Sequence, residues 1–162
     1  MKNFVLFGKP GSGKGTQAEH LSEKYKLYHI STGDLFRKNI SQNTNLGLLA
    51  QSYMDKGELV PDEVTIKMLE NEIKENTQSK GFLFDGFPRT IAQAESLDKF
   101  LKSIDMQINA TIALDVDEEE LISRIIDRGK TSNRSDDQDI EKIQNRFNEY
   151  NIKTSTLSRY YK

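Results

Sequence analysis

The feature that most restricts how this chain folds is a glycine-rich segment near its start, Gly8-Lys9-Pro10-Gly11-Ser12-Gly13-Lys14-Gly15-Thr16. An apolar run over residues 3–7 precedes it, and a helical pattern with Ala18, Leu21 and Tyr25 on one face follows it. Glycines between a strand and a helix allow positive φ angles and let backbone amides approach an anion closely. The order strand, glycine loop, helix therefore predicts a cradle for phosphate groups.

Two side chains of this loop carry the predicted chemistry. Lys14 is placed to reach the β- and γ-phosphates of a nucleotide, and Thr16 supplies a nearby hydroxyl. The common pattern has Ser or Thr directly after the lysine, whereas Gly15 intervenes here. The alternative is a plain glycine-rich turn with an exposed lysine. Four glycines in the correct strand–loop–helix setting make that alternative the weaker one.

The rest of the chain alternates short apolar runs with helical patterns. The runs that are typical of buried strands cover residues 3–7, 27–30, 82–84 and 111–116. Helical spacing covers residues 14–25, 34–40, 46–56, 62–73, 94–101 and 117–125, with one long last helix over 140–157. This alternation predicts an α/β three-layer fold, a central parallel sheet of four strands with helices on both faces. Ligands of such sheets bind at the carboxyl ends of the strands.

Local signals refine the predicted helix boundaries. Asp62 follows Pro61 and is expected to cap the helix over 62–73. Asp117 with Glu120 has the spacing of a capping box for the next predicted helix. Residues 129–137 are polar and are expected to form a loop.

Composition excludes several classes of protein. The chain has no cysteine, so disulfides and thiolate zinc sites are excluded. No leader or membrane span is recognisable, and we expect a cytoplasmic protein. The formal charge of −2 argues against nucleic acid as a partner. Among 23 basic residues, only a few are arginine, whose planar fork suits bidentate binding of phosphate: Arg37, Arg89, Arg124, Arg128, Arg134, Arg146 and Arg159.

Five segments together resemble the adenylate kinase family of nucleoside monophosphate kinases, over nearly the whole chain. They are the loop Gly8–Thr16 with Gln17, then Ser31-Thr32-Gly33-Asp34-Leu35-Phe36-Arg37, Gly57-Glu58-Leu59-Val60-Pro61-Asp62, Asp85-Gly86-Phe87-Pro88-Arg89-Thr90, and Arg124 to Asp137. The Asp-Gly-Phe-Pro-Arg stretch combined with this phosphate loop is highly specific to the family. The resemblance implies a P-loop kinase with a core of residues 1–30, 74–128 and 138–162, an AMP-binding insert 31–73 and a short lid 129–137.

This chain also differs from the usual family pattern at its C-terminal end. Family members usually continue with a fifth strand and a last helix, and the loop after that strand helps to seat the adenine of ATP. Unless something else covers that edge, we expect the strand over 111–116 to be exposed, with lower stability and weaker ATP binding than in a chain extended at its C-terminus.

Site residues follow from the same resemblance. It implies that ATP is bound by Pro10, Gly11, Ser12, Gly13, Lys14, Gly15, Thr16, Arg124, Arg128 and Arg134. It implies that AMP is bound by Thr32, Gly33, Arg37, Gly57, Glu58, Leu59, Val60, Gly86, Arg89, Gln93, Arg134 and Arg146. The implied catalytic residues are Lys14, Arg89, Arg124, Arg128, Arg134 and Arg146. Asp85 and Thr16 would contact Mg²⁺ through water, and no protein zinc site is implied.

The function implied is the reversible reaction ATP + AMP = 2 ADP, catalysed by a monomer with Mg²⁺ as cofactor. Two alternatives stay open: a UMP/CMP-type monophosphate kinase, and a nucleotide-binding module without turnover. Single residues also have plainer interpretations, since Arg124 and Arg128 lie four apart and suit surface ion pairs. The joint occurrence of so many phosphate-binding positions at strand ends favours the kinase.

Overall fold

The computed structural model describes residues 1–132 and 134–161, so Asn133 of the predicted lid and Lys162 lie outside it. Four strands form one sheet: β1 (Phe4–Gly8), β2 (Tyr28–Ser31), β3 (Phe82–Asp85) and β4 (Ala110–Leu114). Their order is β2-β3-β1-β4, and every pair is parallel. Val5 lies opposite Phe84 on one side and Thr111 on the other. The predicted four-stranded parallel sheet is confirmed.

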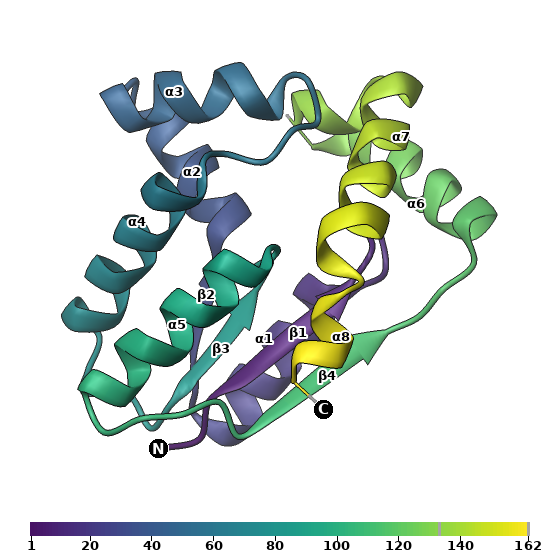
Figure 1. Cartoon of the computed structure of the whole chain (residues 1–162). Coiled ribbons are helices and arrows are strands. Elements are labelled where there is room, and N and C mark those ends of the chain that lie inside the picture. Colours follow the sequence, from purple (N-terminus) through teal and green to yellow (C-terminus); the bar gives the residue numbers. More distant parts are fainter. Residues whose placement is uncertain (133, 162) are drawn as a thin grey trace.

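Helices connect and cover the strands (Figure 1). They are α1 (Lys14–Tyr25), α2 (Thr32–Ser41), α3 (Asn45–Met54), α4 (Asp62–Glu75), α5 (Ile91–Ser103), α6 (Glu118–Thr131), α7 (Ile140–Glu149) and α8 (Leu157–Tyr160). A short 3₁₀ turn, η1 (Ser135–Asp137), precedes α7, and a π-helical turn, η2 (Tyr150–Thr154), follows it.

The alternation of side chains along the strands divides the core into two layers. One face of the sheet buries Leu6 and Leu83 against Ala18 of α1. The other face packs against α4, α5 and α8, with a core of Val5, Phe7, Ile30, Leu69, Ile73, Phe82, Phe84, Phe87, Ala94, Leu97, Leu101 and Leu157. A sheet covered by helices on both faces is the predicted three-layer α/β architecture, which is confirmed.

Two smaller apolar clusters lie beyond the carboxyl ends of the strands, one on each side of the cleft between them. The insert packs α2, α3 and the segment before α4 around Phe36, Ala50 and Val60. On the other side, α6 and α7 pack through Leu121, Ile125, Ile143 and Phe147. Figure 1 shows these two groups of helices facing each other above the sheet.

Strand β4 lies at one end of the sheet and pairs with β1. Its side chains are less covered than those of β1 and β3, since Ala110 and Ala113 are exposed. The strand begins one residue earlier and ends two residues earlier than the apolar pattern predicts, so Asp115 and Val116 belong to the connection to α6. The expectation of an edge position for this strand agrees with the sheet order.

Four predictions of local structure are wrong. Asp117 occupies the position before α6 but makes no capping hydrogen bond. Asp62 is the first residue of α4 rather than its cap, because its carboxylate binds side chains of another segment. The long last helix is interrupted by the π turn at Tyr150–Thr154, and α6 runs to Thr131, into the segment predicted as a loop.

Candidate active site

The glycine-rich loop joins β1 to α1 at the base of a cavity of about 580 Å³. Gly13 precedes α1 with a positive φ of 88° and no capping side chain, so the first amides of the helix are left for a ligand. A Cβ on Gly11 would lie 2.9 Å from Ile125 Cγ1, so glycine at this position lets the loop lie close against α6. The loop therefore combines free amides with close packing on α6.

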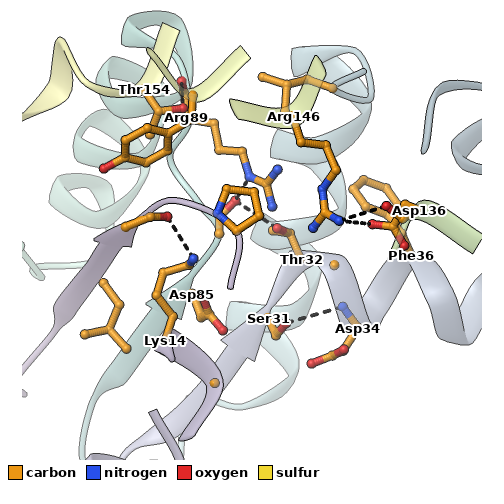
Figure 2. A pocket seen from close by; sticks show the side chains of 18 of the residues that line it. Lys14, Ser31, Thr32, Asp34, Phe36, Asp85, Arg89, Asp136, Arg146 and Thr154 are labelled. Carbon is orange, nitrogen blue, oxygen red and sulfur yellow. Dashed lines mark hydrogen bonds and ion pairs between the residues drawn. The ribbon is translucent and has the colours of Figure 1, made fainter. Parts of the chain in front are cut away.

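Lys14 lies in this cavity at the start of α1 (Figure 2). Its ammonium group donates to the carbonyls of Gly8 at 2.8 Å and Lys9 at 3.0 Å. Burial lowers the pKa of Lys14 to about 8; Asp85 opposes this shift, while Arg89 and Arg146 add to it. Burial makes the charged form of Lys14 less favourable, and an anionic ligand in the cavity would stabilise that charge.

Arg89 extends into the cavity from the loop after β3, near Thr32 (Figure 2). Its Nε donates to the carbonyl of Gly86 at 2.7 Å, and the Thr32 hydroxyl donates to the same oxygen at 3.0 Å. Gly86 has a φ of 76°, and a Cβ there would lie 2.9 Å from Arg89 Nη2, so glycine is required. Burial, with Arg146 nearby, lowers the pKa of Arg89 to about 10.

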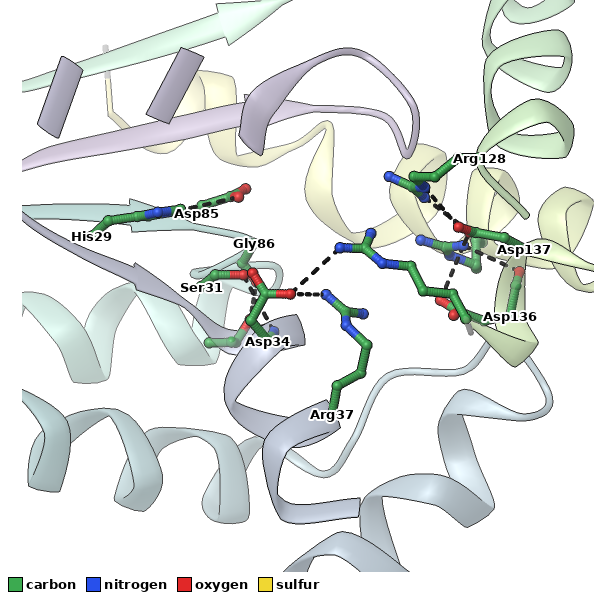
Figure 3. A network of polar contacts seen from close by, with 12 residues as sticks. His29, Ser31, Asp34, Arg37, Asp85, Gly86, Arg128, Asp136 and Asp137 are labelled. Atoms are coloured by element: carbon green, nitrogen blue, oxygen red, sulfur yellow. Dashed lines mark hydrogen bonds and ion pairs between the residues drawn. The ribbon is translucent and has the colours of Figure 1, made fainter. Parts of the chain in front are cut away.

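Two arginines from opposite sides of the cleft meet at Asp34 (Figure 3). Arg37 forms an ion pair with Asp34 within α2, and Arg134, next to η1, reaches the same carboxylate at 3.5 Å. Burial and the charge of Arg37 lower the pKa of Arg134. The insert and the segment after α6 are thus linked across the cleft by a shared carboxylate between two cations.

Arg128 and Arg146 are held by two buried aspartates of η1. Figure 3 labels Arg128 with Asp137, and Figure 2 labels Arg146 with Asp136. Arg128 binds Asp137 through two nitrogens, at 2.6 and 2.9 Å. Arg146 Nη1 contacts Asp137 at 2.7 Å and Asp136 at 3.0 Å. Burial raises the pKa of Asp137, but the hydrogen bonds from Arg128 and Arg146 outweigh burial and hold this pKa below its ordinary value. The guanidinium groups carry further donors that can face a ligand.

Arg124 lines the same cavity, and its side chain is more exposed than those of Arg37, Arg128, Arg134 and Arg146. Its side chain is 48% exposed, and its Nε donates to Glu120 at 2.9 Å, one turn earlier in α6. The plainer interpretation of this residue, an ion pair along a helix, therefore describes its contact in the structure. An exposed pair of this kind is weak, so Arg124 is free to exchange Glu120 for a phosphate.

The far end of the cavity lies in the insert. Residues 57–60 line it together with the buried amide of Gln93 at the start of α5. Gly57 has a φ of 72°, and a Cβ there would lie 2.7 Å from the carbonyl of Lys142 in α7. Asn145 of α7 donates to the carbonyl of Lys56 at 2.8 Å. Glycine at this position lets the insert approach α7 closely.

Comparison with known proteins agrees with this geometry. The sequence model of the family described as adenylate kinase matches residues 6–162. The chain belongs to the adenylate kinase family. Proteins named adenylate kinase from Flavobacterium psychrophilum and Flavobacterium johnsoniae are 65% and 60% identical to it over 162 residues, covering 100% of this chain and 85% of each relative. An adenylate kinase of Bacteroides fragilis is 51% identical over the same length and covers the same shares.

The structure brings the predicted site residues of this adenylate kinase family member onto one cavity, with one exception. The cavity is lined by Pro10, Gly11, Gly13, Lys14, Gly15, Thr16, Thr32, Gly33, Arg37, Gly57, Glu58, Leu59, Val60, Asp85, Gly86, Arg89, Gln93, Arg124, Arg128, Arg134 and Arg146. Ser12 is instead buried beneath the loop, and its Oγ lies 2.5 Å from where a Cβ of Gly8 would be. Any contact of Ser12 with phosphate is therefore through its backbone.

Sequence reasoning missed several lining residues, most clearly Glu149, Tyr150 and Thr154 after α7. Glu149 and Tyr150 lie three and four positions beyond Arg146, and helical spacing from that arginine would have placed them on the same face. Thr154 lies beyond the π turn, where the regular spacing no longer applies. Asp62 and Thr90 end two of the segments that carry the resemblance, but no local pattern indicates that Asp62 binds Gln93.

Asp85 and Thr16 supply the oxygen atoms suited to a divalent cation at the phosphate end of the cavity. Among the residues that the structure describes, no group of three or more His, Cys, Asp or Glu is arranged to hold a metal alone. One carboxylate and one hydroxyl beside a phosphate loop fit Mg²⁺, which keeps several waters and takes phosphate oxygens as ligands.

No helix within residues 1–132 and 134–161 has both the length and the apolar character that crossing a bilayer requires.

Proposed function

We propose that this chain transfers a phosphoryl group reversibly from ATP to AMP, giving two ADP, in the cavity between the phosphate loop and the insert. The observation that carries the proposal is the convergence of six arginines and Lys14 on a single cavity that begins at the phosphate loop. Arg159 is the one arginine outside this set, so the cluster does not simply reflect arginines spread over the whole surface.

The cavity divides into two halves in this proposal. ATP lies against Pro10, Gly11, Ser12, Gly13, Lys14, Gly15 and Thr16, with Arg124, Arg128 and Arg134 at its phosphates. AMP lies against Thr32, Gly33, Arg37, Gly57, Glu58, Leu59, Val60, Gly86, Arg89 and Gln93, with Arg134 and Arg146 shared at the phosphate end. Lys14, Arg89, Arg124, Arg128, Arg134 and Arg146 act on the transferring group.

The reaction requires no base. An oxygen of the AMP phosphate attacks the γ-phosphorus of ATP, and the bond from that phosphorus to the β–γ bridging oxygen breaks. The bridging oxygen leaves as part of ADP, and the acceptor becomes the second ADP. Since the attacking oxygen is already an anion, no proton has to be removed from it.

Electrostatics and exclusion of water supply the catalysis. ATP brings about four negative charges and AMP about two, so the two phosphate chains repel each other. Lys14, Arg89 and Arg146 are preorganised where these charges meet, and they stabilise the equatorial oxygens of the transition state. The contact of Arg134 with Asp34 draws the segment after α6 over the insert, which limits access of water to the phosphoryl group.

Mg²⁺ belongs to this proposal as the cofactor that accompanies ATP. Asp85 and Thr16 are the residues that would hold it, through water. When bound, the ion neutralises charge on the β- and γ-phosphates. The other parts of the proposal are a monomer in the cytoplasm, with neither nucleic acid nor a membrane as partner. Light scattering during gel filtration tests the monomer, which is expected at 18.6 kDa.

A coupled assay for ADP formation tests the function directly. The purified chain is given MgATP with AMP, UMP or CMP in parallel. Turnover with AMP well above that with UMP and CMP is the expected result. Faster turnover with UMP or CMP would identify a pyrimidine monophosphate kinase, and nucleotide binding without ADP formation would identify a binding module; either result overturns the proposal.

A further inference from the structure

The side chain of Gln93 is held at both ends of its amide. Its Oε1 accepts from the backbone N–H of Arg89 at 2.8 Å, and its Nε2 donates to Asp62 Oδ1 at 2.7 Å. The other oxygen of Asp62 accepts from the Thr90 hydroxyl at 2.8 Å, and Thr90 in turn caps α5 by accepting from the N–H of Gln93 at 3.1 Å. Gln93 is 2% exposed, so these contacts are shielded from water.

The two contacts fix which way the amide faces. A carboxylate only accepts hydrogen bonds and a backbone N–H only donates them, so Asp62 and Arg89 demand opposite ends of the Gln93 amide. Turning the amide by half a rotation would place its oxygen against the carboxylate and its NH₂ against an N–H. Both contacts would then become repulsive in a buried place, where unmatched polar groups are costly. The amide therefore has one orientation.

The fixed amide keeps one N–H and one lone pair beyond those that Asp62 and Arg89 use. Gln93 lines the cavity together with Leu59 and Val60, in the half proposed for the acceptor nucleotide. A purine with a 6-amino group presents an acceptor at N1 beside a donor at the 6-position. A 6-oxopurine presents the reverse, a donor at N1 and an acceptor at the 6-position. One amide orientation matches only one of these patterns.

We infer that Asp62 determines specificity, by holding Gln93 in the orientation that accepts a 6-aminopurine monophosphate and rejects a 6-oxopurine monophosphate. This inference rests on the proposed function, since it concerns the acceptor of the same reaction. Asp62 acts through Gln93 and is a positioning residue. It is the first residue of α4, so the insert itself supplies the group that orients an amide of the core.

The test compares AMP with inosine monophosphate as acceptor, in the full chain and in Asp62→Asn. Asparagine keeps the shape of the side chain but can donate as well as accept, so one of the two constraints on Gln93 is lost. We expect the ratio of kcat/KM for AMP to that for inosine monophosphate to fall about tenfold. The change is expected mainly in KM for AMP, because the base lies away from the reacting phosphates.

Glu63→Gln is the matched control. It removes one negative charge from the next residue of α4. Glu63 is exposed, and the hydrogen bonds to Gln93 and Thr90 come from Asp62 instead. An unchanged ratio in this control, together with the fall in Asp62→Asn, supports the inference. An equal fall in both variants would overturn it, because the effect would then come from charge alone.

Asp62→Ser provides a second variant in case Asp62→Asn does not fold, since serine is well tolerated at the start of a helix. The comparison of two substrates within one variant is independent of how much protein is folded. An unchanged ratio in both Asp62 variants overturns the inference while leaving the proposed function intact. Wild-type chain that does not phosphorylate AMP overturns the proposed function, and this inference with it.

Discussion

Lys14 carries a buried positive charge that lies among other cations. Its ammonium group is enclosed by the protein and faces Arg89, Arg128 and Arg146, while Asp85 is the acid that most raises its pKa. Two backbone carbonyls accept its hydrogen bonds. Neutral carbonyls fix the position of the charge without cancelling it, so the charge remains available to a phosphate.

Replacing Lys14 with methionine is expected to lower kcat by roughly a hundredfold to a thousandfold, the loss typical of one preorganised donor in a dry site. Methionine has a similar length and carries no charge that burial would desolvate, so the melting temperature is not expected to fall. The coupled ADP assay and thermal unfolding measure the two quantities. Lys24→Met, on the exposed part of the same helix, is the control and should retain full activity. Full activity in Lys14→Met would remove this lysine from the mechanism.

The same lysine makes stability depend on pH in a defined direction. Its pKa is 10.5 ordinarily and about 8 in the folded chain. Between these values the unfolded chain binds more protons, so the free energy of unfolding rises with pH. Relative to Lys14→Met, the nucleotide-free wild type is expected to gain at most roughly 3 kcal/mol from pH 8 to pH 10.5. Urea unfolding of both proteins across this range measures the difference, and parallel curves would contradict it.

At the scale of single residues, the sequence predicts which residue types line the site better than it predicts their side-chain contacts. The glycine loop and the arginines were found because their residue types are uncommon elsewhere and follow strand ends. The sequence predicts a helix cap at Asp62 rather than its actual contacts, since its partners Thr90 and Gln93 lie 28 and 31 residues away in the chain. Only packing of the insert on the core brings them together, and no local pattern records that packing.

The π turn η2 is the element that departs most from the sequence prediction. Apolar residues continue at helical spacing through Phe147, Tyr150 and Leu157, which predicts one uninterrupted helix. A π turn adds a single residue to one turn and so changes the face that follows, which periodicity over so few turns cannot detect. The shift buries Thr154, whose hydroxyl donates to the carbonyl of Arg89 at 3.0 Å. Figure 2 shows Thr154 beside Arg89.

Removing this hydrogen bond is expected to affect both stability and catalysis. Thr154→Val keeps the shape but leaves the Arg89 carbonyl without its partner, at a cost of about 1 kcal/mol in the free energy of unfolding. We also expect a several-fold loss of kcat/KM, because the loop that carries Arg89 is held less firmly. Urea unfolding and the coupled assay measure these effects.

Two variants make this prediction specific. Thr156→Val removes an exposed hydroxyl that donates to the carbonyl of Lys153 at 2.9 Å, and it should leave kcat/KM unchanged. Thr154→Ser keeps the hydroxyl and should retain most of the activity. Equal kinetics in Thr154→Val and Thr156→Val would limit Thr154 to a structural role.

The other elements were predictable because each has its own periodic signal. All four strands were found, and their apolar runs reflect burial on both faces of a parallel sheet. Boundaries were less accurate where an element ends by tertiary contact. Helix α6 continues to Thr131 although its last turn is polar, and the carbonyl of Asp137 lies 2.6 Å from where a Cβ of Gly129 would be. Close packing of η1 on that glycine cannot be read from the local sequence.

At the scale of the whole molecule, the chain is a sheet with two helical groups that meet over its carboxyl edge. The groups touch through Arg134 with Asp34 and through Asn145 with the carbonyl of Lys56. Each group brings its own cations to the cavity between them: α2 supplies Arg37, whereas α6 supplies Arg124 and Arg128. From this arrangement we predict two separable anion sites within one cavity rather than a single diffuse positive patch.

Ligand-dependent stability distinguishes these two possibilities. AMP or MgATP alone, each at about 100 times its Kd, is expected to raise the free energy of unfolding by about 2.7 kcal/mol. Arg37→Ala should remove most of the effect of AMP but keep that of MgATP, and Arg124→Ala should do the reverse. Both side chains are partly exposed and pair with exposed acids, so neither change should unfold the free protein. Urea unfolding with each ligand separately measures the four combinations. Should either variant lose both effects equally, the cations would form one shared patch, and in-line transfer between two fixed nucleotides would lose its structural basis.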